Sequence, residues 1–267
     1  MMRTKATLGS IFHQLLERHY GNPSFDAEDI FKGVEARWRD RVMEAGGDLQ
    51  QMEGILAQAY PLFLGYAAHY RKKDADKEWL QLEGVFDVQW NDYRLRGRCD
   101  GLYRDKSGKV WLLETKTKSR ISEDTMTCAL NFDPQNLFYI LAKEQETGLS
   151  ISGVLYNVIR QPSLKQKQSE TKEDFFDRIG KDIAERSDHY FMRYEVKYTE
   201  RQKREHRAEL ICKLKEFEAW CGGKMPTYKS ECSCQRGWAC EYLEACATGK
   251  LVGYNQDGVL FSELLED

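Results

Sequence analysis

The spacing of apolar residues changes twice along the chain, from a helical period to alternation and back. In the N-terminal third, apolar side chains recur every three or four positions, beginning with Leu8, Ile11, Phe12, Leu15 and Leu16. This period predicts three helices, over residues 7–21, 25–47 and 48–74. Pro61 falls inside the third helix and should kink or split it, because proline cannot donate the helical hydrogen bond.

The middle of the chain alternates between apolar and polar residues, as strands do when one face is buried. The alternating runs cover residues 80–90, 93–104, 109–117 and 151–160. The sequence DKSGK between the second and third runs indicates a hairpin. A helix is expected over residues 133–148, with Pro134 in its first turn and Gly148 at its end.

The last hundred residues combine polar and helical patterns. Residues 161–172 are rich in lysine and have no period, which indicates a mobile excursion. Thr171 and Asp174 are spaced as in a capping box and should begin a helix. A short strand over residues 192–199 and a charged helix over 199–221 should follow.

Together these patterns predict a single α/β domain over residues 1–267, in which helices flank a central mixed sheet. The predicted parts are an N-terminal helical part (1–78), a core (79–160), a helical and basic insertion (161–221) and a cysteine-rich tail (222–267).

Composition is that of a globular protein, with 41% hydrophobic and 31% charged residues. The net charge of −3 does not by itself indicate a nucleic-acid partner, although a mixed surface can hold a basic channel. No apolar run approaches the roughly 20 residues of a membrane span, and the first residues lack an apolar signal region. We therefore expect a cytoplasmic protein without a membrane partner. Eight cysteines in such a protein favour metal binding over disulfides.

The stretch WLLETKTKS, residues 111–119, begins as a buried strand and ends in charged residues. Because alternate residues of a strand share a face, Glu114 and Lys116 should point the same way as Leu112. The hairpin returns this strand beside the one that carries Asp100. The two carboxylates could then bind one hard divalent cation such as Mg²⁺. By itself, the E-x-K tripeptide is more often a salt-bridged surface hairpin.

Several chemically active residues occur in an order that resembles a known family. In chain order they are His13, Glu83, Asp100, Glu114, Thr115, Lys116, Gln135 and Tyr139. They resemble the motifs of the PD-(D/E)XK nuclease superfamily in its RecB-type branch, over roughly residues 8–160. The Pro-Asp pair that names the superfamily is Cys99-Asp100 here. The resemblance implies a restriction-endonuclease-like core with helical additions.

The resemblance also implies a role for each residue. The ligands of Mg²⁺ or Mn²⁺ would be His13, Asp100, Glu114 and the carbonyl of Thr115. Glu83 would support the site. Lys116 would act on the attacking water and the scissile phosphate, and Gln135 and Tyr139 would position DNA and brace the site. Lys118 and Arg120, beside the motif, are candidate contacts to DNA phosphates. A packed histidine and a solvated helix surface are the alternatives for His13 and for the Gln135–Tyr139 pair.

The tail carries Cys232, Cys234, Cys240 and Cys246. The last two enclose five residues and resemble the final pair of iron–sulfur RecB-type nucleases, in which a 4Fe–4S cluster fastens the tail to the nuclease core. The chain departs from that pattern, because no cysteine precedes Cys99 and the usual C-x-x-C is Cys232-x-Cys234. The tail could supply all four ligands, or Cys128 could replace one. A Cys₄ zinc site and unligated cysteines are the alternatives.

The function that the resemblance implies is metal-dependent, exonucleolytic hydrolysis of DNA. It would serve recombination, repair or phage DNA processing in a bacterial or phage-infected cell. The chain has no G-x-x-x-x-G-K-[ST] motif, so a helicase or recombination protein would be a separate partner. The alternatives are a structure-specific endonuclease, an RNA-directed nuclease and a non-catalytic DNA-binding protein that retains the fold. The presence of Asp100, Glu114 and Lys116 argues against the last.

Overall fold

The computed structural model describes residues 4–22, 24–119, 121, 123–226, 234, 240 and 242–254. By its contacts the chain forms two compact units, residues 1–203 and 204–267. The division into four parts that the sequence suggested stays a prediction.

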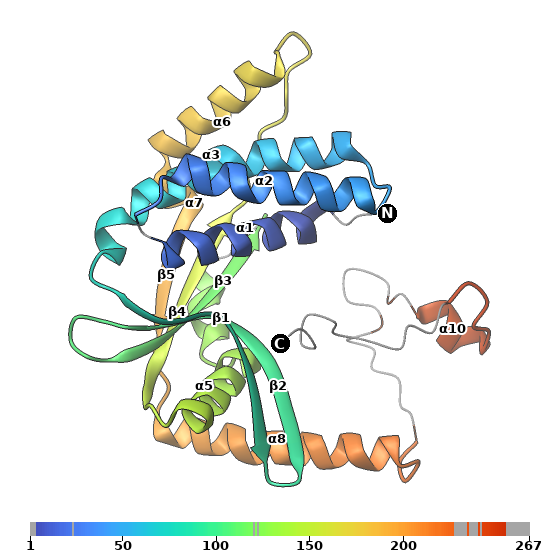
Figure 1. Ribbon diagram of the computed structural model, residues 1–267. Helices are drawn as coiled ribbons and strands as arrows, with labels where there is room; N and C mark the ends of the chain where they lie inside the picture. The colour runs from blue at the N-terminus through green and yellow to red at the C-terminus, as the bar shows by residue number, and fades with distance from the viewer. Residues whose placement is uncertain are drawn as a thin grey trace. The chain divides into compact units, whose positions relative to one another are not determined.

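The first unit is built on a five-stranded mixed sheet whose strands follow chain order (Figure 1). Its strands are β1 (Glu78–Trp90), β2 (Tyr93–Arg104), β3 (Val110–Lys118), β4 (Ile151–Arg160) and β5 (Phe191–Val196). Strands β3 and β4 pair in parallel, and the other neighbours pair antiparallel. The predicted hairpin joins β2 to β3. In its turn Asp105 N donates to Lys109 O, and Gly108 has a φ of 81°, which only glycine adopts readily.

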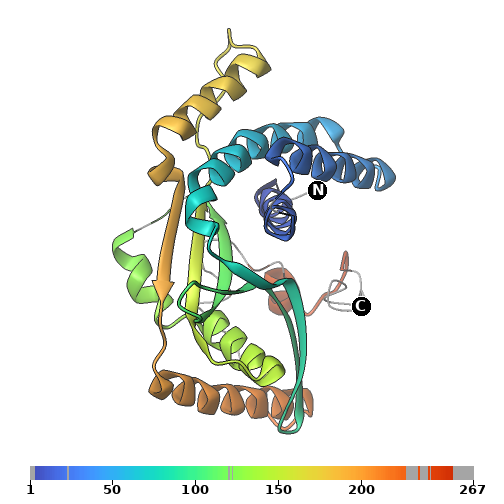
Figure 2. The same ribbon diagram turned by 60° about the vertical axis from the view of Figure 1, so that its left-hand side comes forward.

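Helices from the N-terminal third cover one face of this sheet (Figure 2). They are α1 (Thr4–Gly21), α2 (Ala27–Glu44) and α3 (Leu49–Asp74), and α6 (Lys172–Glu185) packs beside α3. Their apolar side chains meet Trp111, Leu113 and Ile159 of the sheet in one buried core. Helix α3 runs unbroken through Pro61, so the expected split does not occur. Buried neighbours on both sides of the proline, such as Ala59 and Leu62, hold the helix in place.

Two further helices, α4 (Glu123–Leu130) and α5 (Pro134–Thr147), pack on the opposite face against Leu112, Val154 and Val158. Helix α4 was not expected from the sequence. The ends of α5 are as predicted, because Pro134 lies in its first turn and Gly148 closes it with a φ of 70°. Two cores therefore lie on the two faces of one sheet, and β3 is buried between them.

The remaining elements are α7 (Ser187–Tyr190), α8 (Glu200–Cys221) and α10 (Leu243–Thr248). Helix α6 begins at Thr171 as predicted, and Thr171 Oγ1 accepts from Asp174 N at 3.1 Å as its N-cap. In the polar segment before it, Glu170 accepts two hydrogen bonds from Arg178 of α6. Among the described helices, none has the length and apolar character needed to cross a membrane.

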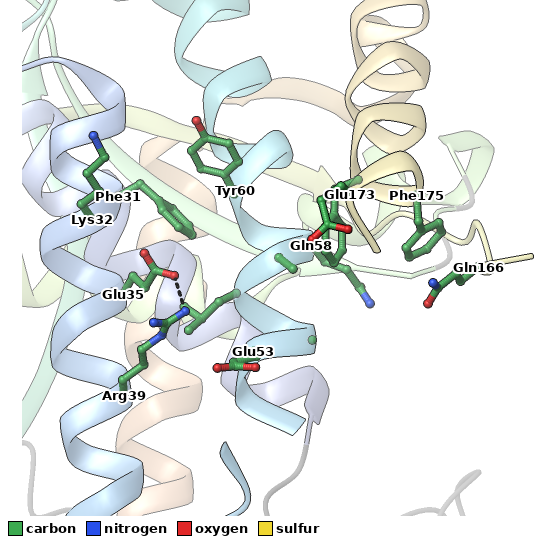
Figure 3. A pocket seen from close by; sticks show the side chains of 14 residues that line it. Phe31, Lys32, Glu35, Arg39, Glu53, Gln58, Tyr60, Gln166, Glu173 and Phe175 are labelled. Carbon is green, nitrogen blue, oxygen red and sulfur yellow. Dashed lines mark ion pairs between the residues drawn. The ribbon is translucent and has the colours of Figure 1, made fainter. Parts of the chain in front are cut away.

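A pocket of about 670 Å³ lies among α2, α3 and α6 (Figure 3). Phe31, Tyr60 and Phe175 contribute aromatic walls, and the ion pair between Arg39 and Glu35, 3.0 Å long, lies at its edge. None of the residues that resemble the nuclease motifs lines this pocket. The candidate site therefore lies elsewhere, where α1 and α5 meet β1, β2 and β3.

Candidate active site

Strands β2 and β3 bring Asp100 and Glu114 together. Gly101 pairs with Leu113 and Leu102 with Leu112, and just beyond these pairs the charge of Asp100 acts on Glu114. Alternation places Glu114 and Lys116 on the face that α5 covers. Asp100 is fixed against β3, because the backbone N–H of Thr115 donates to its Oδ2 at 2.6 Å. The binding of one cation by both carboxylates, expected from the hairpin, stays a prediction.

Glu114 is a buried carboxylate with one oxygen left unsatisfied. Its side chain is only 3% exposed. Oε1 is paired with Lys116 Nζ, and Oε2 has no hydrogen-bond partner within the described residues. Burial first, and then the charge of Asp100, raise the pKa of Glu114 to about 7. A buried oxygen without a donor is costly unless something cationic faces it.

Two further possible metal ligands, His13 and Glu83, lie beside Asp100. Among the residues that the structure describes, His13, Glu83 and Asp100 offer ligand atoms that lie within 4.8 Å of one another. Nδ1 of His13 is 3.4 Å from Glu83 Oε1 and 3.4 Å from Asp100 Oδ1. Burial alone would lower the pKa of His13, but the two carboxylates outweigh it and raise that pKa to about 10. The sequence had assigned Glu83 a supporting part, and the structure places its carboxylate inside this group.

Lys116 is held from two sides. Besides its pair with Glu114, Nζ donates to Gln135 Oε1 at 3.1 Å. Gln135 Nε2 in turn lies 3.0 Å from the hydroxyl of Tyr139, one turn further along α5. Burial lowers the pKa of Lys116, but Glu114 outweighs it and leaves that pKa raised. The side chain is therefore a fixed ammonium group beside the carboxylates, and a poor proton acceptor at neutral pH.

The first turn of α5 is oriented by its own capping residue. Asp133 Oδ1 accepts from the backbone N–H of Gln135 at 2.9 Å. This cap determines where α5 begins, and so which face carries Gln135 and Tyr139. Gln135 thus reaches Lys116, and Tyr139 reaches Gln135, because α5 begins where the sequence has Asp-Pro.

A buried polar network on the other face of β3 was not anticipated from the sequence. Asn157 of β4 donates to Thr115 Oγ1 at 3.3 Å and to Tyr66 OH at 2.9 Å, and its Oδ1 accepts from Arg193 of β5. Arg193 also makes two hydrogen bonds to Asp74, at the end of α3. No local pattern marks Asn157, because it is a single polar residue within the apolar run VLYNVI of β4.

The remaining predicted site residues are Lys118, Arg120 and the cysteines of the tail. Lys118 ends β3 with its Nζ 5.8 Å from the centre of the Tyr156 ring. Arg120 and Cys232 fall outside the described residues. In the tail, Cys240 N donates to Cys234 O at 3.3 Å, and Cys246 lies in α10. The described part of the chain brings no three cysteine sulfurs together. Cys128, offered as a substitute ligand, is exposed on α4.

Comparison with known proteins bears on the fold and on the family. A profile of the PD-(D/E)XK nuclease superfamily matches residues 2–247. Curated proteins give no match. Among solved structures, a "Putative exonuclease" from Eubacterium rectale has a TM-score of 0.51 at 11% identity, over 93% of this chain and 80% of its own. The crystal structure of SSO0001 has a TM-score of 0.27 at 15% identity, over 55% of this chain and 68% of its own. At 11% identity, the similarity to the Eubacterium rectale structure shows a shared fold and nothing more.

Proposed function

The chain belongs to the PD-(D/E)XK nuclease superfamily, and we propose that it hydrolyses phosphodiester bonds in DNA with a divalent metal ion. One observation carries the proposal. Asp100 accepts from the backbone N–H of Thr115, between Glu114 and Lys116 on β3, with His13 against Asp100 and Glu83 and with Gln135 against Lys116. A non-catalytic DNA-binding protein would not need an ammonium group held beside two converging carboxylates.

The residues present fit a hard cation. Glu114 Oε2 is buried and has no donor among the described residues, and His13, Glu83 and Asp100 offer N and O atoms within 4.8 Å of one another. Carboxylate oxygens with one imidazole nitrogen suit Mg²⁺ or Mn²⁺. Such an ion would lower the pKa of a bound water and neutralise charge on the phosphate. The ligands would be Asp100, Glu114 and His13, with Glu83 in reach and the carbonyl of Thr115 as a further candidate.

The chain's own residues would then orient and stabilise the reacting groups. The ammonium of Lys116 would donate to a non-bridging phosphate oxygen, where negative charge grows as water attacks phosphorus. Gln135 would keep that ammonium from turning away, and Tyr139 would hold Gln135. Because the pKa of Lys116 is raised, the lysine would act as a positive charge and not as the base that accepts the water's proton.

Exonucleolytic action on DNA is the finer part of the proposal. It takes its support from the RecB-like order of motifs and from the solved neighbour described as a "Putative exonuclease". Recombination, repair or phage DNA processing would be the setting, and a helicase or recombination protein would be a separate partner. Lys118 and Arg120 would contact the DNA backbone.

A degradation assay tests this proposal directly. Purified protein with Mg²⁺ or Mn²⁺ is incubated with linear and covalently closed circular DNA, each single- and double-stranded, and with RNA. We expect loss of linear DNA only. Cutting of closed circles would establish an endonuclease, and cleavage of RNA alone would remove DNA as the substrate. Absence of any cleavage with either ion would overturn the catalytic proposal.

Removal of a carboxylate from the site should weaken metal binding. Asp100→Ala and Glu114→Ala should each weaken Mn²⁺ binding, measured by titration calorimetry, by more than the roughly tenfold loss expected for an outer partner of a metal site. Glu170→Ala is a matched control, because this little-exposed carboxylate pairs with Arg178 of α6, away from the candidate site. Unchanged Mn²⁺ affinity in both site variants would exclude them as ligands.

The cysteine tail carries a separate proposal, which rests on the sequence pattern. If Cys232, Cys234, Cys240 and Cys246 bind a 4Fe–4S cluster, protein purified without oxygen should be brown and contain iron and sulfide in near-equal amounts. Cys240→Ser should then lower the melting temperature before it affects cleavage, because metal binding supplies folding free energy. Colourless protein with stoichiometric zinc would replace the cluster by a zinc site. Metal-free protein with unchanged melting in Cys240→Ser would remove both.

A further inference from the structure

Glu83 has an unusual backbone conformation for a residue inside a strand. Its φ is 45°, in the left-handed region that side chains other than glycine rarely adopt. Leu82 pairs with Gly101 and Gly84 with Cys99, so Glu83 stands opposite Asp100 in the β1–β2 ladder. A non-glycine residue persists in this conformation only where its surroundings impose it. The conformation brings the carboxylate of Glu83 against His13.

One buried side chain forms hydrogen bonds to β1 on both sides of Glu83. Lys143 of α5 is completely buried. Its Nζ donates to Gln81 Oε1 at 2.7 Å and reaches Val85 O at 3.5 Å, two residues before and two residues after Glu83. The third partner is Glu146 Oε2, at 2.6 Å, which balances the charge. Lys143 therefore connects α5 to both flanks of the irregular part of β1.

The contact with Gln81 also explains the glycine beside Glu83. A Cβ at Gly84 would lie 2.1 Å from Cδ of Gln81 and 2.5 Å from its Oε1. The side chain of Gln81 thus lies directly against the backbone of Gly84, and Lys143 holds it there. Any residue other than glycine at position 84 would push Gln81 away from Lys143.

From these contacts we propose that Lys143 is a positioning residue for the nuclease site. Through Gln81 and Val85 it imposes the left-handed backbone at Glu83 and so aims that carboxylate at His13 and Asp100. Helix α5 then orients the site at two points, since Gln135 holds Lys116 and Lys143 holds Glu83. This inference rests on the proposed function, because it assigns a purpose to an arrangement around the proposed metal ligands.

The chain offers a closely matched control in Lys203. This second buried lysine also pairs with a glutamate of α5, with Nζ 2.7 Å from Glu144 Oε1, and also reaches a strand carbonyl, Ile151 O, at 3.3 Å. It does not contact β1 in the described structure. Lys143→Met and Lys203→Met both remove a buried ammonium group from a glutamate, and only the first releases Glu83.

The experiment compares these variants by melting temperature, Mn²⁺ calorimetry and cleavage kinetics. Both should melt at lower temperature than the wild type. Lys143→Met should also bind Mn²⁺ about tenfold more weakly and lose about tenfold in kcat, the effect of removing an outer partner of a metal site. KM for DNA should change less than twofold. Lys203→Met should keep wild-type Mn²⁺ affinity and kcat. Equal metal affinity and kcat in the two variants would overturn the inference.

Two milder comparisons keep the test decisive if Lys143→Met does not fold. Gln81→Ala should weaken Mn²⁺ binding, whereas Gln81→Glu retains an acceptor for Lys143 and should not. Glu83→Gly should melt a few degrees higher than Glu83→Ala, because glycine adopts a positive φ without strain. Equal affinity in the Gln81 pair, or an alanine variant as stable as the glycine variant, would contradict the proposal.

The design separates this inference from the proposed function. If the wild type neither binds Mn²⁺ nor cleaves nucleic acid, the proposed function fails. If the wild type does both and Lys143→Met matches Lys203→Met, only the positioning role fails.

Discussion

Lys116→Ala should lower kcat by about a hundredfold or more and leave KM for DNA and Mn²⁺ affinity close to wild type, the effect of removing one preoriented charge. Nζ of Lys116 is fixed between Glu114 and Gln135 Oε1, so its position costs no reorganisation during the reaction. The pKa of Lys116 is raised by Glu114 against the opposing effect of burial, so the charge is present at neutral pH. The variant should therefore lose stabilisation of the transition state, which lowers kcat, and keep its binding of substrate, which leaves KM unchanged.

The measurement is steady-state cleavage of a labelled linear DNA, with Mn²⁺ calorimetry on the same samples. Lys109→Ala serves as the control, because this exposed lysine lies just before the other end of the same strand, outside the site. It should retain wild-type kcat. Turnover in Lys116→Ala near that of Lys109→Ala would refute the role assigned to Lys116, even if the protein proves to be a nuclease.

Arg193→Ala should be the most destabilising single change proposed for the fold, at about 3–5 kcal/mol, because it removes the guanidinium from a buried carboxylate and leaves that carboxylate only Lys77 and Tyr20. Arg193 and Asp74 are 11% and 8% exposed. The guanidinium also donates to the hydroxyls of Tyr20 and Tyr66, and so joins α1, α3 and β5. A loss of this size should lower the melting temperature by on the order of 10 °C.

Arg186→Ala is the matched control for this change. Arg186 makes the same two-point contact with an aspartate, Asp182, at 2.8 and 2.6 Å, but its side chain is 50% exposed. Since exposed ion pairs contribute little, its melting temperature should stay near that of the wild type. Equal melting of the Arg193→Ala and Arg186→Ala proteins would show that the buried network does not support the fold.

The same network predicts a direction for acid sensitivity. Burial would raise the pKa of Asp74, but the hydrogen bonds and charge of Arg193 outweigh it and lower that pKa below its ordinary value of 3.8. A carboxylate with a lowered folded-state pKa contributes stability above its unfolded pKa and loses it as pH falls through the folded-state value. Part of the acid unfolding of the wild type, below pH 3.8, should therefore come from Asp74.

Local pattern alone determined the elements that carry the proposed catalytic residues. Alternation marks β2 and β3, and the DKSGK turn between them sets the register that brings Asp100 to the N–H of Thr115, next to Glu114. The Asp-Pro start of α5 likewise determines that Gln135 and Tyr139 share one face. These features depend on neighbours in the chain, so short-range rules of period, turn and cap suffice to predict them.

Only the tertiary structure decided which distant groups meet. Parallel pairing of β3 with β4 brings Asn157 beside Thr115, and the packing of α1 on the sheet brings His13 to Asp100. The sequence shows a histidine and an asparagine in apolar elements, and either could have been an ordinary buried residue. Their partners are tens of residues away, and local pattern does not specify a contact of that range.

The positive φ of Glu83 and the burial of Lys143 were likewise decided only by the tertiary structure. A lysine on an otherwise amphipathic helix predicts a solvated position, because an unpaired buried ammonium group is strongly disfavoured. It is buried here because folding supplies Gln81, Val85 and Glu146 around it. Sequence by itself determined which side chains could do chemistry. Folding decided which of them are held together, since the free energy that orients a buried charge comes from partners that only the complete fold assembles.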